Sequence, residues 1–298
     1  MTPLLQRLTN GEIVVADGAM GTMLIQRGLA SIGACPEAVN LTRPDVLEEI
    51  ARLYRDAGAE IIETNTFGAS PLKLAMYGMD ARTEEINRAA AAAVRRAVGA
   101  GAYVSASCGP CGKMLKPYGD AEPQAVADGF RRQMAALAES GVDVFCIETM
   151  TDLAEAKLAV KAAKEVAPRI PVMATMTFSL TPRGFFTMMG ANIQKATLGL
   201  QEAGADIVGS NCGNGVEQMI RIAAEFRRHT ALPLLIQSNA GLPVMKDGST
   251  VYPEGPDFMA GKAGDLIAAG ANIIGGCCGT TPEHIRAIRR AVDSRSAH

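Results

Sequence analysis

A fourfold internal repeat constrains the fold of this chain more than any other feature of its sequence. Each copy places a glycine, followed by Ala or Val, just before a short run rich in Val and Ile. The copies lie at 57–67, 140–149, 203–212 and 269–278. They are separated by roughly twice the 30 residues that one strand and its helix occupy. One further strand and helix can therefore fit into each interval.

Four more runs of this kind lie at 12–21, 102–110, 171–178 and 233–241. All eight are followed by amphipathic or alanine-rich segments, such as 45–58, 84–99, 152–166 and 216–229. Apolar strands that alternate with helices are typical of a parallel sheet buried on both faces. Because no linker separates two halves, we predict an α/β fold with a single (β/α)8 TIM barrel domain spanning residues 1–298. A doubly wound open sheet is the competing architecture.

Charge and composition exclude several classes of partner. The chain has 29 Lys and Arg against 31 Asp and Glu, a net charge of −2, so no basic field attracts nucleic acid or an anionic membrane. It has neither a signal-like N-terminus nor an apolar run of about 18 residues, and we expect a cytoplasmic protein. The seven cysteines are then expected to serve metal binding or thiol chemistry.

Catalytic residues of such barrels follow the carboxyl ends of the strands. The groups expected there are carboxyls, amides and thiols, including Asp17, Glu63, Asn65, Glu148, Asn211 and Asn239. The three histidines fall in or after helices, and no lysine lies at a strand end. This pattern disfavours a histidine-based hydrolase, a histidine-rich metal site and a Schiff-base lysine.

Three cysteines form the strongest candidate for a metal site. Cys212 ends the sixth run, and Cys277 and Cys278 end the eighth. Neighbouring side chains of a regular strand point to opposite faces, so both can reach one centre only where the backbone bends, which the flanking glycines permit. Three thiolates suit tetrahedral Zn2+ and leave its fourth position open for a substrate. The alternative is that each cysteine is a small buried hydrophobic residue, as we expect for Cys146.

Six motifs follow one another along almost the whole chain: DGAMGT (17–22), ETNTF (63–67), IET (147–149), SNCG (210–213), NAGLP (239–243) and GGCCGTTPEHI (275–285). Together they closely resemble the zinc-dependent homocysteine S-methyltransferase family, especially the homocysteine-binding domain of cobalamin-dependent methionine synthase. The resemblance implies a (β/α)8 fold, zinc held by Cys212, Cys277 and Cys278, and homocysteine as the methyl acceptor, giving methionine.

The resemblance also implies how the amino acid is bound. Backbone amides after the first strand are expected to hold its carboxylate, around Gly18, Ala19, Met20 and Thr22. Asp17 and Glu148 are expected to hold its ammonium. Asn211 is a further candidate for substrate contact, with a loop-bracing role as the alternative. A metal-bound thiolate that attacks an activated methyl group needs no general acid or base, which agrees with the lack of His and Lys at the strand ends.

The methyl donor divides this family into users of S-methylmethionine, betaine and methylcobalamin. The motifs at 63–67 and 239–243 look most like the cobalamin-dependent branch, so we expect a methyl-corrinoid donor. No cobalamin-binding domain follows the barrel in this sequence, so the corrinoid is expected free or on a separate corrinoid protein. The apolar loop 178–190, with Phe185 and Phe186, is a candidate docking surface, unless these residues pack onto the barrel rim.

Several alternatives stay open. The donor could be S-methylmethionine or betaine, and the acceptor another thiol. A phosphate-binding barrel lyase or isomerase would use the helix start at Thr281 and Pro282, but leaves the paired cysteines unexplained. A non-catalytic zinc subunit that docks a corrinoid protein is a further class. Cys108 and Cys111 match a redox CxxC motif, but no clear helix start follows them, and we expect no redox role.

Overall fold

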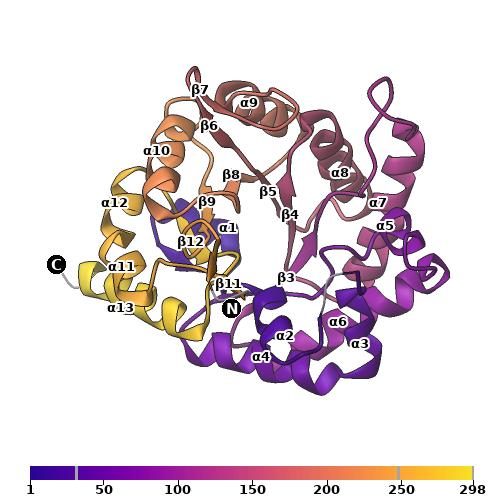
Figure 1. Cartoon of the computed structure of the whole chain (residues 1–298), viewed down its shortest axis with the longest axis horizontal. Helices are drawn as coiled ribbons and strands as arrows, with labels where there is room; N and C mark the ends of the chain where they lie inside the picture. The colour runs from indigo at the N-terminus through magenta and orange to yellow at the C-terminus, as the bar shows by residue number, and fades with distance from the viewer. Residues whose placement is uncertain (31–32, 247–248, 297–298) are drawn as a thin grey trace.

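Eight parallel strands form one sheet in the order β1-β12-β9-β8-β5-β4-β3-β2. The computed structural model describes residues 1–30, 33–246 and 249–296. The strands are β1 (Val14–Val15), β2 (Ile61–Glu63), β3 (Tyr103–Cys108), β4 (Val144–Met150), β5 (Val172–Met176), β8 (Ile207–Asn211), β9 (Leu234–Ser238) and β12 (Ile273–Gly276). A parallel bridge between Ala16 and Ile61 joins the two edge strands. The sheet therefore closes into the predicted barrel and is not an open sheet (Figure 1).

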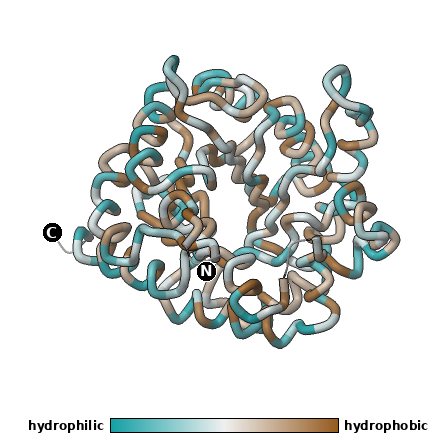
Figure 2. The backbone as a smooth tube through the Cα atoms, viewed as in Figure 1, coloured by the Kyte–Doolittle hydropathy of each residue, from teal (hydrophilic) through white to brown (hydrophobic). Residues whose placement is uncertain are grey.

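Helices surround this barrel (Figure 1). The longer ones are α4 (Pro44–Asp56), α6 (Thr83–Val98), α7 (Pro123–Glu139), α8 (Leu153–Val166), α9 (Ile193–Ala203), α10 (Val216–Arg227) and α13 (Pro282–Ser296). Shorter ones are α1 (Leu4–Thr9), α2 (Met20–Gln26), α3 (Val39–Thr42), α5 (Pro71–Ala75), α11 (Pro256–Gly261) and α12 (Ala263–Ala268). Figure 2 shows hydrophilic residues concentrated on this outer ring. None of the helices in the described part of the chain is long and apolar enough to cross a membrane.

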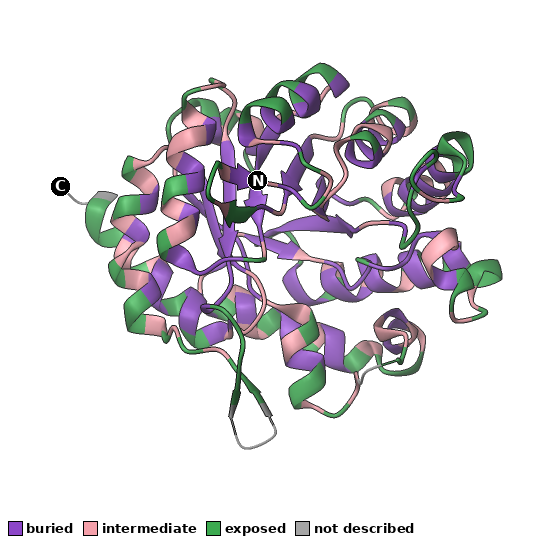
Figure 3. Cartoon of the chain, turned by 45° about the horizontal axis from the view of Figure 1, so that its top comes forward, coloured by how far each residue is buried: buried purple, intermediate pink, exposed green. Residues whose placement is uncertain are grey.

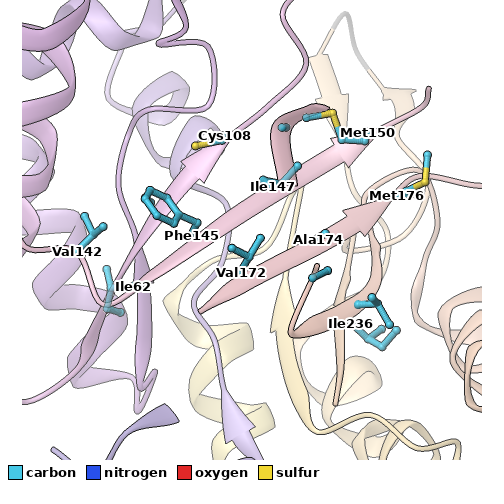
Figure 4. Close-up of a cluster of buried hydrophobic side chains, with 14 of the residues drawn as sticks. Ile62, Cys108, Val142, Phe145, Ile147, Met150, Val172, Ala174, Met176 and Ile236 are labelled. Atoms are coloured by element: carbon cyan, nitrogen blue, oxygen red, sulfur yellow. The ribbon is translucent and has the colours of Figure 1, made fainter. Parts of the chain in front are cut away.

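The alternation of strand residues produces two hydrophobic layers. Inward-facing residues, among them Ile61, Tyr103 and Cys146, form one cluster, to which α1 contributes Leu4 and Leu8. The outward-facing residues pack against the helices in a second, larger cluster. Figure 4 shows part of that outer layer around β3, β4 and β5. The inner cluster fills the barrel from the end at which α1 lies, so the polar site is confined to the opposite end of the strands.

The two long rim loops each contain an antiparallel hairpin. β6 (Ser179–Thr181) pairs with β7 (Gly184–Phe186), and β10 (Val244–Lys246) pairs with β11 (Ser249–Val251). The second hairpin stands away from the barrel body in Figure 3, and its described residues are mainly exposed. Phe185 is buried, with the Arg221 guanidinium 5.2 Å from its ring centre. The expected docking role of Phe185 is therefore wrong, because it packs onto the rim; Leu180 and Met188 are the exposed apolar residues of that loop.

Candidate metal and substrate site

The three predicted cysteines meet at the carboxyl end of the barrel. The sulfur atoms of Cys212, Cys277 and Cys278 all lie within 4.8 Å of one another. The Sγ atoms of Cys212 and Cys278 are 3.8 Å apart. A tetrahedral ion with metal–sulfur bonds near 2.3 Å separates its ligands by about 3.8 Å. The spacing of these thiols therefore fits a zinc ion.

A tight turn brings both adjacent cysteines to this centre. β12 ends at Gly276, and the N–H of Thr280 donates to the carbonyl of Cys277 at 3.1 Å. Gly279, the third residue of this turn, has a φ of 81°, as a type II turn requires. The turn thus supplies the bend that a regular strand cannot.

Cys212 also departs from strand geometry. Its φ is 59°, in the left-handed region that non-glycine residues seldom adopt. Its backbone N–H still donates to the carbonyl of Gln237 on β9, at 3.2 Å. Backbone strain of this kind persists where the surrounding structure enforces it, and it is common at functional sites.

A cavity of about 260 Å³ adjoins the three cysteines. Its wall includes the loop after β1, with Gly18, Ala19, Met20, Gly21 and Thr22, and the carboxyls of Glu63 and Glu148. Among the described residues that line it there is no Lys, Arg or His. The cavity therefore places acidic groups beside the thiols without a basic side chain to neutralise them.

Glu148 is held in place by several hydrogen bonds. The hydroxyl of Ser107 donates to one carboxyl oxygen of Glu148, and the amide of Asn211 donates to the other at 3.0 Å. Asn211 is fully buried and also accepts from the backbone N–H of Thr149 at 2.7 Å and from the Thr175 hydroxyl at 2.8 Å. Its amide nitrogen is 3.9 Å from the sulfur of Cys277. Asn211 thus braces Glu148 from behind the cavity wall.

Three carboxyl groups share this interior. Burial raises the pKa of Asp17 from its usual 3.8 to about 8, and burial together with the charge of Asp17 raises the pKa of Glu63 to about 7. Burial and the charge of Glu63 raise the pKa of Glu148 well above its ordinary value. The charge of Glu63 therefore disfavours a second negative charge on Glu148.

Asp17 lies beneath the cavity and does not line it. One of its carboxyl oxygens accepts from the backbone N–H of Glu63 at 2.9 Å, while the other is buried without a hydrogen-bond partner. The next residue is Gly18, where a Cβ would lie 2.6 Å from the hydroxyl of Thr280 and 3.0 Å from the ring of Tyr54. This close approach explains why glycine occupies the position.

Eight of the ten predicted site residues line the cavity: Gly18, Ala19, Met20, Thr22, Glu148, Cys212, Cys277 and Cys278. Asp17 and Asn211 lie behind its wall. Glu63, a weaker candidate from its strand-end position, lines the cavity together with Ser107 and Gln237. No sequence motif marked Ser107 or Gln237 as a site residue, and only their positions at strand ends could have indicated them.

Cys108 and Cys111 lie apart from the cavity and do not line it. Both are free and belong to the hydrophobic cluster between strands and helices, where Figure 4 shows Cys108 at the end of β3. Burial raises the pKa of Cys111 to about 12 and that of Cys108 further still. Thiols in such surroundings stay protonated and unreactive at neutral pH.

Comparisons with known proteins agree with this geometry. Methionine synthases of Mycobacterium leprae and Mycobacterium tuberculosis are 34% and 35% identical to this chain over 98% of its length. The chain spans about a quarter of the length of these two relatives. The metallated form of the homocysteine methyltransferase MmuM from Escherichia coli superposes with a TM-score of 0.80 and 25% identity, covering 97% of this chain and 99% of the other.

A model of the family described as homocysteine S-methyltransferase matches residues 14–292. That range contains the eight strands of the barrel and the three clustered cysteines. This chain belongs to the homocysteine S-methyltransferase family.

Proposed function

We propose that this enzyme transfers a methyl group from a methyl-corrinoid to the sulfur of homocysteine, with zinc held by Cys212, Cys277 and Cys278. The observation that carries the proposal is the group of three sulfur atoms within 4.8 Å of one another, beside a cavity rich in carboxyls. A bound zinc ion would supply the positive charge that keeps a fourth, substrate thiol deprotonated at neutral pH.

The carboxyls of the cavity suit the ammonium of an amino acid. We assign the direct contact to Glu148, because it lines the cavity and its orientation is fixed by Ser107 and Asn211. Asp17 lies behind the wall with a raised pKa, so it would contribute negative charge only when an ammonium bound nearby favours its ionised form. The cluster has no basic side chain of its own on the cavity wall, so an incoming ammonium would provide the missing positive charge.

The loop after β1 suits the carboxylate of the same substrate. α2 begins at Met20, and the first N–H groups of a helix have no acceptor within the helix. The loop is fixed from behind, because Thr280 accepts from the N–H of Ala19 at 3.2 Å and the hydroxyl of Tyr54 contacts the carbonyl of Ala19 at 3.3 Å. The two charged ends of homocysteine would thus be bound by different elements of one cavity.

Support for a corrinoid donor comes from the similarity to methionine synthases along 98% of the chain. The exposed apolar residues of the rim, such as Leu180 and Met188, offer a surface on which a corrinoid protein can dock. S-methylmethionine and betaine are the alternative donors, and a different thiol is the alternative acceptor.

The test is methionine formation from homocysteine with methylcobalamin, a methylated corrinoid protein, S-methylmethionine and betaine supplied in parallel. We expect turnover with a corrinoid donor and one zinc ion per chain. Rapid turnover with S-methylmethionine or betaine and none with either corrinoid would reject the donor assignment.

Replacement of any of the three cysteines by Ala should remove both zinc and activity while the barrel stays folded. A double variant, Cys108→Ala with Cys111→Ala, is the matched control and should keep both. Zinc binding without any thiol methylation by the unchanged protein would favour a non-catalytic docking subunit.

A further inference from the structure

Thr280 lies between the two segments that meet at the candidate metal centre, the loop after β1 and the turn at 277–280, which we call the cysteine turn. It is fully buried and does not line the cavity. Its hydroxyl donates to the carbonyl of Cys277 at 2.7 Å and accepts from the backbone N–H of Ala19 at 3.2 Å. One side chain therefore connects a predicted zinc ligand with the loop after β1, and both of the residues that it joins line the cavity.

The bare backbones of two glycines leave room for this connection. A Cβ on Gly18 would lie 2.6 Å from the hydroxyl oxygen of Thr280, and a Cβ on Gly276 would come closer still to the same atom. Gly276 ends β12, the strand that pairs with β1. The position of the hydroxyl is therefore fixed by the ends of two neighbouring strands.

Two further hydroxyls join the same segments. The hydroxyl of Thr22 accepts from the backbone N–H of Gly279 at 3.1 Å. The hydroxyl of Tyr54, on α4, lies 3.3 Å from the carbonyl oxygens of both Ala19 and Thr280. Tyr54 and Thr280 are completely buried, so their hydroxyls could not replace a broken hydrogen bond with one to water. The loop after β1 and the cysteine turn are thus held to each other.

We propose that Thr280 is a positioning residue that couples the two halves of the site, so that an amino acid bound against the loop after β1 strengthens zinc binding by the cysteine turn. The inference rests on the proposed function, which assigns the amino-acid end of homocysteine to that loop and zinc to the three cysteines. It adds a residue that lies outside both the cavity wall and the predicted ligand set.

The coupling has its physical basis in the ordering of the chain. An amino acid bound to the loop after β1 would restrict the motion of that loop, and the Thr280 hydroxyl would transmit the restriction to the carbonyl of Cys277. A turn that is already held in one geometry loses less conformational entropy when its thiols bind zinc. Because coupling between two ligands is reciprocal, zinc should strengthen amino-acid binding by the same factor.

The test measures zinc affinity by chelator competition, with and without L-2-aminobutyrate. This probe keeps the ammonium and the carboxylate of homocysteine but has no thiol to bind the metal. The variants are Thr280→Ala and Thr280→Ser, which differ from each other by the hydroxyl alone. A direct electrostatic effect of the probe on zinc is the same in both variants, so the difference between them reports the hydroxyl bridge.

The matched control is Thr197→Ala on α9. Thr197 is also fully buried, and its hydroxyl donates to the carbonyl of Ile193 at 2.7 Å. The control therefore removes a buried, hydrogen-bonded hydroxyl that takes no part in the bridge.

We expect saturating 2-aminobutyrate to raise zinc affinity about fivefold or more in the unchanged protein, in Thr280→Ser and in Thr197→Ala. In Thr280→Ala the factor should fall below about twofold, even where zinc affinity itself is lower. A merely structural role of Thr280 would lower zinc affinity equally with and without the probe and leave the factor unchanged. Tyr54→Phe removes another hydroxyl between the same segments and should also reduce the factor, so it provides the test if Thr280→Ala does not fold.

Equal factors in Thr280→Ala and Thr280→Ser would overturn the inference, and so would a factor below about twofold in the unchanged protein. In both cases the binding of zinc and of the amino acid would still support the proposed function. Absence of zinc binding or of amino-acid binding from the unchanged protein would overturn the proposed function and the inference together.

Discussion

Replacement of Asp17 by Asn should stabilise the metal-free and substrate-free protein at neutral pH. Asp17 is completely buried, and one of its carboxyl oxygens has no hydrogen-bond partner. Burial raises its pKa from 3.8 to about 8, so the folded state retains a proton that the unfolded chain has already released at pH 5. An amide of the same shape is neutral in both the folded and the unfolded state. The two states of the variant therefore bind the same number of protons at this position.

The magnitude follows from proton linkage. Where the folded state binds one more proton than the unfolded state, the free energy of unfolding falls by about 1.4 kcal/mol for each unit of rising pH. For Asp17 this loss begins near pH 4 and is complete near pH 8. Between pH 5 and pH 7 the unchanged protein should therefore lose about 2.7 kcal/mol relative to Asp17→Asn. The charge of Asp17 also contributes to the raised pKa of Glu63. Replacement of Asp17 should therefore lower the pKa of Glu63 as well, which adds to the stability of the variant at neutral pH.

The assay is chemical unfolding at pH 5, 6, 7 and 8, with Asp120→Asn as the control because Asp120 is exposed. The stability difference between Asp17→Asn and the unchanged protein should grow with pH, and that of the control should stay constant. Saturating zinc and homocysteine should narrow the difference, since an ammonium nearby stabilises the charged form of Asp17. A difference that stays flat within about 0.5 kcal/mol from pH 5 to pH 7 would refute the account, because the linkage slope requires several times that change.

Three further predictions concern other parts of the molecule. Glu148→Gln should raise the KM for homocysteine about tenfold, which corresponds to about 1.4 kcal/mol, with less effect on zinc content; an unchanged KM with a new pH dependence of kcat would instead indicate a general base. Gly209→Ala should cost roughly 3 kcal/mol of stability in chemical unfolding, because its Cβ would lie 1.8 Å from the carbonyl oxygen of Leu235; Gly261→Ala, with open space around it, is the control, and equal stabilities would contradict the steric argument. Leu180→Ser combined with Met188→Ser should lower the rate with a methylated corrinoid protein more than the rate with free methylcobalamin, and equal losses with both donors would argue against docking at this loop.

The barrel could be predicted from the sequence because its signal is repeated. Eight apolar runs give eight strands, and their order around the sheet follows from chain order alone. The cysteine site was predictable for a related reason: parallel strands all end on one rim, so residues at 212 and 277–278 must lie on the same side of the barrel. The glycines around the pair indicated the bend that the turn at Gly279 provides.

Features that depend on the direction of individual side chains could not be predicted from the sequence. Phe185 and Leu180 lie in the same apolar loop, yet the first is buried and the second exposed, because the loop folds into a hairpin that sequence periodicity did not indicate. The contact between the ring of Tyr252 and the backbone of Gly279 joins residues from two different loops. No local pattern reports such a pairing, since it arises when β10 and β11 return the chain to the rim.

Under the proposed function, the three cysteines and the buried carboxyls would have separate roles, the first in reactivity and the second in the choice of substrate. A zinc ion on the three cysteines would hold the thiolate of any thiol that reaches it, so the cysteines alone would not distinguish homocysteine from other thiols. The buried carboxyls can, because they remain protonated or carry uncompensated charge until an ammonium arrives, and either state costs free energy. Under the proposed function, an ammonium bound near Asp17 would offset part of the free-energy cost that its burial introduces into the empty barrel. Replacing the carboxyls should raise the stability of the protein and reduce its discrimination between thiols. It should leave the cysteine centre unchanged.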